Sequence, residues 1–402
     1  MLPVTILLAS VLKPLDDTRM LGKFGRTLAG RAGTVVHVAG RAAPTPPDLP
    51  ANLRVQELLR GTRLSWERLA AQRRYWQLLQ RLRPTVVFVH APELLPATVL
   101  WQLCHPATRF VYDVRENYAL NIRTQRVYPA WARGLLAGLV RRLETLAAAR
   151  AAAVLLAERS YAPELPFAAG AAADSDSHPF ANNQQPTTNN QQPVLVIENK
   201  YQPYDSCPVP YPRRLPERTQ PLRLVYSGTI SELNGIWEAL RFAAHLRTVW
   251  PLAHLTIIGY CQQPGLLPRL QAAVAASGGG VTLVGGAGLV PHARVLAEIR
   301  ASHLGLLPYR PHSSTARCIP TKLFEYLGEA LPLVVPPNPL WVALAEEARA
   351  GLVFDFQQPD YPPAQELAAA LEQGLYYPLG PPPGAFWPLE AEKLHWLMDC
   401  IK

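Results

Sequence analysis

A lysine and a glutamate lie three residues apart at a predicted helix start in the second half of the chain. The run Pro320-Thr321-Lys322-Leu323-Phe324-Glu325 opens with a proline, which favours the first turn of a helix, and the spacing puts Lys322 and Glu325 on one face. A helix N-terminus and an ammonium group neutralise a diphosphate, and a carboxylate one turn later can accept both hydroxyls of a ribose. This pattern indicates a nucleoside diphosphate site. The alternative is a surface Lys–Glu pair, which contributes only about 0.3–0.5 kcal/mol.

Two other strand ends in the second half have a similar form. In open parallel sheets, ligands bind beyond the carboxyl ends of the strands, where glycine-rich turns present free N–H groups to phosphate. Ser227-Gly228-Thr229 and Gly259-Tyr260 each end a predicted strand. We predict that the nucleotide-binding side of the site consists of Ser227, Gly228, Thr229, Gly259, Tyr309, Arg310, Arg317, Thr321, Lys322 and Glu325.

Charged residues also follow predicted strands of the first half. Asp113, Arg115 and Glu116 come at the end of one strand, and together with Lys322 they are the candidate catalytic residues. The opposite side of the site, where a second substrate would bind, is predicted to hold Asp16, Asp17, Arg19, His90 and Glu93. Each assignment has a simpler alternative, because acidic residues and histidine at such places also cap turns and helices or keep a loop soluble.

The elements that must position these residues alternate between strand and helix. Apolar, β-branched runs predict strands at 4–9, 34–39, 85–90, 109–113 and 152–157, and leucines spaced three and four apart predict helices at 55–82 and 131–149. Further strands are predicted at 194–197, 222–227, 254–260, 281–284, 304–308, 333–335 and 352–355. The predicted fold class is therefore α/β, with two Rossmann-like, doubly wound parallel-sheet domains.

Composition marks the domain boundaries. Residues 168–193 are rich in Ala, Asn, Gln, Ser and Pro, cannot bury much apolar surface, and are expected to form a disordered insertion. We predict a domain at 1–198 on the side of the second substrate, a nucleotide-binding domain at 199–385, and a helix at 386–402 that crosses back to the first domain. The apolar N-terminal run is interpreted as a buried strand, because Lys13, Asp16 and Asp17 interrupt it before a membrane-spanning length is reached.

The charge is unevenly distributed and limits the classes of partner. Residues 1–165 contain 23 Lys and Arg against 11 Asp and Glu, a net charge of +12, while the remainder carries −3. A basic helix over 131–150 suits peripheral contact with an anionic membrane, and the alternative is a core helix with a charged outer face. Its arginines are Arg133, Arg141, Arg142 and Arg150. Nucleic-acid binding is not expected, because the arginines are dispersed along helices with few aromatics between them.

The five cysteines form no CxxC pair and no Cys–His cluster at metal-ligand spacing. We therefore expect no metal site and a reducing environment, which means a cytoplasmic protein, at the inner face of the membrane if the basic helix makes the contact above.

The order of the motifs resembles that of retaining GT-B glycosyltransferases of the family 4-like group. The similarity is carried by 302–309, 319–328 and 331–334, with 226–229 and 257–259 before them. It implies two domains that face a cleft, a sugar nucleotide as the substrate, no cofactor, no metal, and transfer with retention of configuration. The acceptor would be a saccharide or a lipid-linked molecule in cell-surface polysaccharide or glycolipid synthesis. In this family pattern Lys322 and the Thr321 backbone bind the diphosphate of the donor, and Glu325 binds the ribose.

The chain departs from the family pattern at three places. Asp113-Val114-Arg115-Glu116 has arginine where relatives often have histidine, and Thr229 and Asn234 occupy the positions of the usual Arg and Lys clamp on the diphosphate. Arg317 stands where the first of two glutamates is common. Arg310, Arg317 and Lys322 together are hypothesised to supply the missing charge. The rival interpretation is a catalytically inactive GT-B paralogue that binds or scaffolds, and a sugar-nucleotide epimerase ranks third.

Overall fold

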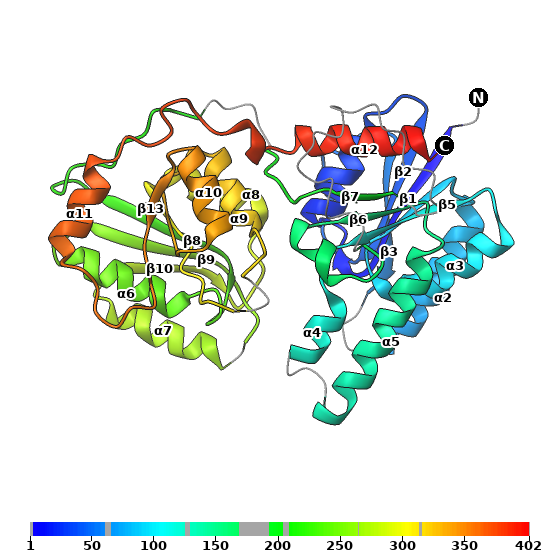
Figure 1. The fold of residues 1–402 in the computed structure, drawn as a ribbon, viewed down its shortest axis with the longest axis horizontal. Coiled ribbons are helices and arrows are strands. Elements are labelled where there is room, and N and C mark those ends of the chain that lie inside the picture. The colour runs from blue at the N-terminus through cyan, green and yellow to red at the C-terminus, as the bar shows by residue number, and fades with distance from the viewer. Residues whose placement is uncertain are drawn as a thin grey trace. The chain divides into compact units, whose positions relative to one another are not determined.

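The chain forms two compact units, each built on its own parallel sheet. The structure, a computed structural model, describes residues 3–60, 66–124, 129–168, 193–203, 209–263, 265–312 and 316–401. Unit 1 consists of Met1–Asn199 and Trp387–Lys402, and unit 2 of Lys200–Phe386 (Figure 1). Nearly all of the predicted insertion at 168–193 lies outside the described residues. The two parallel sheets confirm the predicted fold class.

Unit 1 contains a seven-stranded parallel sheet in the order β3-β2-β1-β4-β5-β6-β7. Its strands are β1 Val4–Pro14, β2 Thr34–Arg41, β3 Leu53–Leu59, β4 Val86–Val89, β5 Arg109–Val114, β6 Ala153–Leu156 and β7 Val194–Val196. The direction of winding reverses between β1 and β4. In doubly wound folds this switch point is where a crevice forms beyond the carboxyl ends of the strands.

The helices of unit 1 connect these strands and cover both faces of the sheet. They are the π-helix η1 Thr18–Gly25, α1 Arg26–Ala29, α2 Glu67–Leu82, η2 Pro92–Leu94, α3 Leu95–Cys104, α4 Tyr118–Thr124, α5 Ala130–Ala148, η3 Arg159–Glu164 and α12 Pro388–Cys400. The predicted helix at 55–82 is wrong in its first part, because Leu53–Leu59 pairs with β2 as an edge strand. Leu53, Leu58 and Leu59 are buried in this strand. Their spacing also fits one face of a helix, and this is why the sequence pattern predicted a helix here.

The last helix of the chain belongs to the core of unit 1. Leu394, Leu397 and Met398 of α12 are fully buried and share a hydrophobic cluster with Leu8 of β1 and Phe24 of η1. The Lys393 ammonium donates a hydrogen bond of 3.1 Å to the backbone carbonyl of Val196, on the edge strand β7. Segments nearly 400 residues apart in the sequence therefore form one core.

Unit 2 contains a six-stranded parallel sheet in the order β10-β9-β8-β11-β12-β13, with its switch point between β8 and β11. The strands are β8 Leu222–Ile230, β9 Ala253–Cys261, β10 Val281–Gly286, β11 Leu304–Leu306, β12 Leu333–Val335 and β13 Gly351–Val353. The helices are α6 Ile236–Arg247, α7 Leu266–Ala276, α8 His292–Ala301, α9 Thr321–Gly328, α10 Pro339–Glu347, α11 Ala364–Gln373 and η5 Pro383–Ala385.

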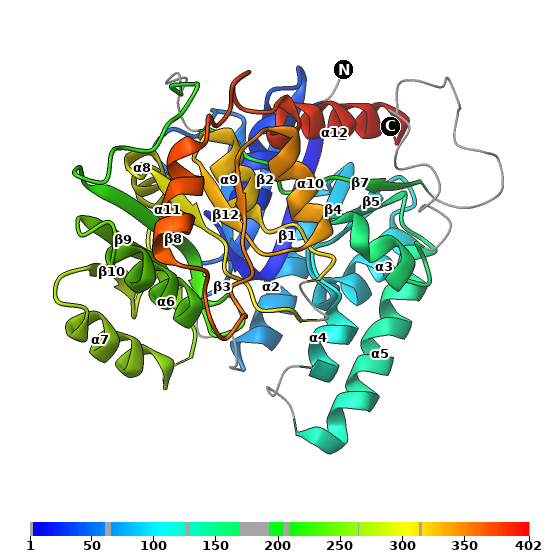
Figure 2. The same cartoon turned by 60° about the vertical axis from the view of Figure 1, so that its left-hand side comes forward.

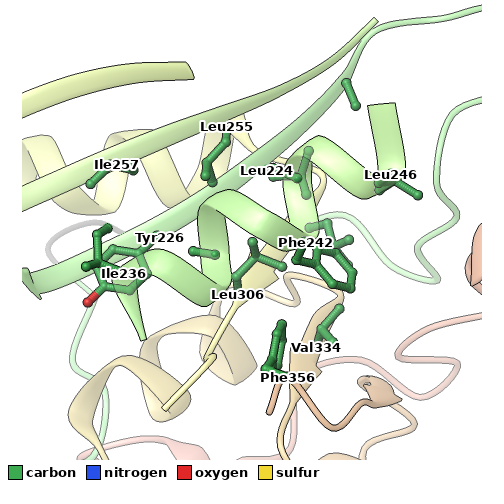
Figure 3. Packing of buried hydrophobic residues seen from close by; sticks show 14 of the residues in the cluster. Leu224, Tyr226, Ile236, Phe242, Leu246, Leu255, Ile257, Leu306, Val334 and Phe356 are labelled. Atoms are coloured by element: carbon green, nitrogen blue, oxygen red, sulfur yellow. The ribbon is translucent and has the colours of Figure 1, made fainter. Parts of the chain in front are cut away.

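Alternate residues of the central strands of unit 2 enter two different cores. Leu224, Tyr226 and Ile257 pack with α6, α7 and α11 on one face, and Figure 3 shows this cluster around Phe242. Val225 and Ile258 pack with α8, α9 and α10 on the other face. Figures 1 and 2 show the same two helix layers on opposite sides of β8–β10. Apolar cores on both faces therefore bury these strands, as is usual for a parallel sheet.

Candidate functional site

The carboxyl ends of three neighbouring strands in unit 2 form a row of glycines. Gly228 of β8 is in register with Gly259 of β9, which is in register with Gly285 of β10. A Cβ atom on Gly259 would lie 1.7 Å from the Gly228 carbonyl oxygen, and one on Gly285 would lie 2.4 Å from the Gly259 carbonyl oxygen. Only glycine fits at these two positions, so this edge of the sheet presents backbone without side chains. Gly228 and Gly259 were predicted as site residues, whereas Gly285 was not.

Lys322 lies beside this row, in the first turn of α9, at the switch point of the sheet. Its ammonium nitrogen is 4.7 Å from the ring centre of Tyr226 on β8 and 5.1 Å from that of Tyr309, just after β11. It would also lie 3.5 Å from a Cβ atom on Gly228. The residue is 7% exposed, and within the described ranges the nitrogen has no hydrogen-bond partner. Burial, opposed by the charge of Glu325, lowers the pKa of Lys322 to about 7.

At the start of α9, the first N–H groups receive no side-chain cap from the residues that the structure describes. Pro320 is the N-cap residue and contributes no side-chain hydrogen bond to the helix. Thr321 is the first helical residue, directly before Lys322. An uncapped helix N-terminus, an ammonium group and a glycine edge meet at one place, and this is a favourable arrangement for an anion.

Glu325 lies one turn further along α9 and is 7% exposed. One of its oxygens, Oε1, is 2.7 Å from Nε2 of His292, the first residue of α8. The imidazole fixes the orientation of the carboxylate, and Oε2 remains as an acceptor for a ligand hydroxyl. His292 was not predicted as a site residue, since no local pattern connects it to a residue 33 positions away.

The remaining donor-side candidates have mixed positions. The Ser227 hydroxyl is fully buried, 3.0 Å from the Tyr326 hydroxyl, and so holds the strand end to α9. Thr229 is exposed, and its carbonyl oxygen accepts hydrogen bonds from Asn234 at 3.0 Å and from the Tyr226 hydroxyl at 2.9 Å. This loop is therefore held by neutral groups at the positions where the family pattern has a cationic clamp.

The two arginines that were hypothesised to replace the clamp differ from Lys322. The Arg310 guanidinium donates a 2.7 Å hydrogen bond to the Glu238 carboxylate on α6, which balances its charge. Arg317 is exposed, in the loop before α9. Among the described residues of this site, Lys322 is therefore a buried cation that has no hydrogen-bonded carboxylate to balance its charge.

In unit 1, three candidate residues meet at the switch point between β1 and β4. Arg19 of η1 donates two hydrogen bonds to the Asp113 carboxylate, at 2.6 and 2.9 Å, and a third of 2.8 Å to the carbonyl oxygen of Ile197. His90, after β4, places its Nδ1 atom 2.6 Å from Asp113 Oδ2. Both His90 and Asp113 are fully buried, and Arg19 is 1% exposed.

The charges of this cluster are strongly perturbed. Burial would raise the pKa of Asp113, but the Arg19 charge outweighs it and holds that pKa far below its ordinary value. Burial lowers the pKa of His90 despite the neighbouring carboxylate, so the imidazole is neutral near pH 7 and donates its Nδ1 proton to Asp113. The cluster joins η1 to the carboxyl ends of β4 and β5, and all three side chains are enclosed by protein.

The other first-half candidates form a more open group. Arg115 makes a bidentate pair with Asp17, at 2.8 and 3.0 Å, and Asp17 also accepts the backbone N–H of Met20 as the cap of η1. Burial would raise the pKa of Asp17, but Arg115 keeps it well below its ordinary value. Glu116 pairs with Lys13 at 3.0 Å.

The two remaining acceptor-side candidates, Asp16 and Glu93, have other surroundings. Burial raises the pKa of Asp16, which precedes the η1 cap. Glu93 accepts a 2.8 Å hydrogen bond from Arg68 of α2. Neither residue is joined to the Arg19–Asp113–His90 cluster by a described hydrogen bond.

The described residues contain no cluster of three or more His, Cys, Asp or Glu side chains that could hold a metal ion. Among the same residues, no helix has the length and apolar character needed to cross a membrane.

Solved structures resemble this chain over almost its whole length, although neither a protein-family model nor a curated protein matches its sequence. HepE from Anabaena, solved with UDP and glucose, has a TM-score of 0.58 at 11% identity, over 98% of this chain and 99% of that one. WaaG, a glycosyltransferase involved in lipopolysaccharide biosynthesis, has a TM-score of 0.56 at 14% identity, covering 99% and 94%. A candidate UDP-N-acetylglucosamine 2-epimerase from Listeria monocytogenes has a TM-score of 0.58 at 11% identity, covering 99% and 96%. At these identities the likeness concerns the fold.

Proposed function

We propose that this chain, which has the GT-B fold, is a glycosyltransferase that uses a nucleoside-diphosphate sugar. The observation that carries the proposal is the anion site of unit 2, where the glycine row, the start of α9 and Lys322 meet. Glu325, held by His292, lies one helical turn from Lys322, and this arrangement supports a role for its carboxylate as the acceptor of a ribose hydroxyl. HepE, which shares the fold, was solved with UDP and glucose, and this supports a sugar nucleotide as the ligand class.

The proposed chemistry requires charge stabilisation more than a nucleophile. A sugar nucleotide carries its own leaving group, so the protein must stabilise the departing diphosphate and orient an acceptor hydroxyl. Lys322 and the N–H groups of Thr321 and Lys322 would stabilise the phosphate oxygens, and the bare edge at Gly228 and Gly259 lets them approach the backbone. We propose transfer without a metal, because Lys322 supplies the positive charge that a metal would otherwise provide. We also propose retention of configuration, on the resemblance of the motifs to those of retaining GT-B enzymes.

We place the acceptor at unit 1, where Arg115 and Glu116 are partly exposed around Asp17. A lipid-linked acceptor is supported by α5, on which Trp131, Leu135 and Leu139 recur every four residues and are 83%, 75% and 63% exposed. Arg142, also exposed, lies on the same helical face. An exposed apolar stripe with arginines is typical of a helix that lies on an anionic membrane. We therefore propose a cytoplasmic enzyme of polysaccharide or glycolipid synthesis that contacts the membrane peripherally.

The test is donor turnover and binding across UDP-, GDP-, ADP- and TDP-sugars, comparing the wild type with Glu325→Ala. Loss of the ribose contact should weaken binding of the active donor by about tenfold or more, since a hydrogen bond to a charged group contributes about 1.5–3 kcal/mol. Glu347→Ala, an exposed glutamate on α10, is the matched control and should leave binding unchanged. Equal binding in wild type and Glu325→Ala would remove Glu325 from the site.

The neutral loop at Thr229 and Asn234 supports a second candidate function, a binding protein that has lost catalysis. Such a protein would bind a donor and never consume it, even with acceptor mixtures present. Product analysis also covers the epimerase alternative, which would return an epimerised sugar nucleotide with no transfer.

A further inference from the structure

The Lys322 ammonium group lies in surroundings that solvate it poorly. Its nitrogen faces the rings of Tyr226 on β8 and Tyr309 after β11, and the backbone of Gly228. The charged group that acts on it is Glu325 on α9, which is held by His292 of α8. Arg310, which follows Tyr309 in the sequence, pairs with Glu238. No hydrogen bond to the nitrogen exists among the described residues. Among the described residues, the nitrogen is therefore enclosed by aromatic rings and backbone without a hydrogen-bonded counter-anion.

These surroundings favour the neutral amine when the site is empty. Removing an ammonium group from water disfavours its charged form, and two aromatic faces return only part of that cost. Glu325 acts in the opposite direction, but its Oε1 atom is engaged by His292. The resulting pKa of about 7 divides the amine and ammonium forms roughly equally at neutral pH.

We propose that binding of a sugar nucleotide at α9 draws a proton from solvent onto Lys322 in every molecule where this residue is neutral, which converts the amine to an ammonium ion paired with a phosphate oxygen. This inference rests on the proposed function, because it assigns a protonation step to the same diphosphate site. No covalent bond forms or breaks. The ligand's negative charge stabilises the ammonium form, so the proton stays for as long as the diphosphate remains bound.

The link between donor binding and protonation of Lys322 makes donor affinity depend on pH in one direction. The pKa of Lys322 rises when the anion binds, so affinity is greatest below the pKa of the empty site and falls above it, by up to tenfold per pH unit. With a ligand-free pKa of about 7, proton uptake should approach about 0.9 per bound ligand at pH 8 and about 0.1 at pH 6. The diphosphate of a sugar nucleotide is esterified at both ends and does not titrate in this range.

Isothermal titration calorimetry of the full chain with UDP-glucose, ADP-glucose and GDP-mannose measures this directly. Each titration is repeated at pH 6 and pH 8 in buffers with different ionisation enthalpies. The slope of the observed binding enthalpy against the ionisation enthalpy of the buffer gives the number of protons taken up. Lys322→Arg is the matched variant, because arginine remains charged at both pH values. We expect uptake at pH 8 in the wild type, close to none in Lys322→Arg, and an affinity in the variant that does not depend on pH.

A second measurement does not depend on how well arginine fits the site. Lysines carrying ¹³C-labelled methyl groups are titrated by NMR in the ligand-free wild type, and Lys322→Met identifies the Lys322 resonance by its absence. A resonance that titrates near neutral pH and moves to higher pH with the donor supports the proposal. Donor binding without proton uptake, or equal uptake in Lys322→Arg, overturns it while leaving the proposed function intact. If none of the donors binds, the proposed function fails and this inference fails with it.

Discussion

Asp113 is a predicted catalytic residue, and its contacts also suit a residue that positions others. Both carboxylate oxygens accept hydrogen bonds from Arg19, and Oδ2 also accepts one from His90. The group is fully buried, so a substrate could reach it only after local opening. Through Arg19, Asp113 also fixes the segment at Ile197 and Asn199, where unit 1 ends.

Replacing Asp113 with asparagine should therefore lower the free energy of unfolding of unit 1. The change leaves the Arg19 guanidinium buried without a counter-charge, which typically costs about 3–5 kcal/mol. Glu116→Gln is the control, because Glu116 is 42% exposed and its pair with Lys13 contributes about 1 kcal/mol or less. Urea unfolding at pH 7 compares the two.

The effect of Asp113→Asn should also depend on pH, because the pKa of Asp113 is depressed in the folded state. The carboxylate's contribution to the free energy of unfolding is complete above about pH 5 and declines on acidification. The difference in free energy of unfolding between wild type and Asp113→Asn should therefore become smaller toward pH 3. A variant that unfolds like the wild type but transfers no sugar would instead support the predicted catalytic role of Asp113.

At the scale of the elements, α5 carries an exposed stripe that its own unit does not cover. Substituting serine for both Trp131 and Leu135 should weaken sedimentation with phosphatidylglycerol vesicles by tenfold or more, since burying one such side chain contributes about 1.5–3 kcal/mol. Leu379→Ser, at a leucine of unit 2 that is 94% exposed, should have no effect. Vesicles of phosphatidylcholine should bind less of the wild type, because each arginine near an anionic surface contributes about 1 kcal/mol. Equal binding of both variants to both lipids would contradict the membrane proposal.

The elements themselves were largely predictable from the sequence. Strands buried on both faces of a parallel sheet read as continuous β-branched runs, so β1, β2 and β8 were evident. Leu53–Leu59 was missed because an edge strand with exposed Arg54 and Glu57 resembles one face of a helix.

Contacts between elements were harder to predict. The helical positions of Lys322 and Glu325 follow from local spacing, and both lie on α9. The partnership of Glu325 with His292, and the register that brings Gly285 into the glycine row, depend on the packing of α8 and β10. No local pattern encodes either contact.

At the scale of the whole molecule, the chain order and the folding units do not coincide. Unit 1 is incomplete without α12, which the chain supplies only after all of unit 2. Unit 2 has separate cores on the two faces of its sheet, and these include no residue of α12. A destabilising substitution in α12 should therefore lower the stability of unit 1 and leave that of unit 2 unchanged, although the helix directly follows unit 2 in the sequence.

Leu394→Ala tests this division. Leu394 is fully buried beside residues of β1 and η1, and truncation of a core leucine costs about 2–5 kcal/mol. Leu389→Ala, on the same helix but 37% exposed, should cost well under half of that. Hydrogen exchange measured peptide by peptide should show faster exchange throughout β1, β2 and β4 in Leu394→Ala, with β8, β9 and α6 unchanged. Faster exchange in both units by the same factor would show that they unfold as one cooperative body, and α12 would then stabilise the entire chain.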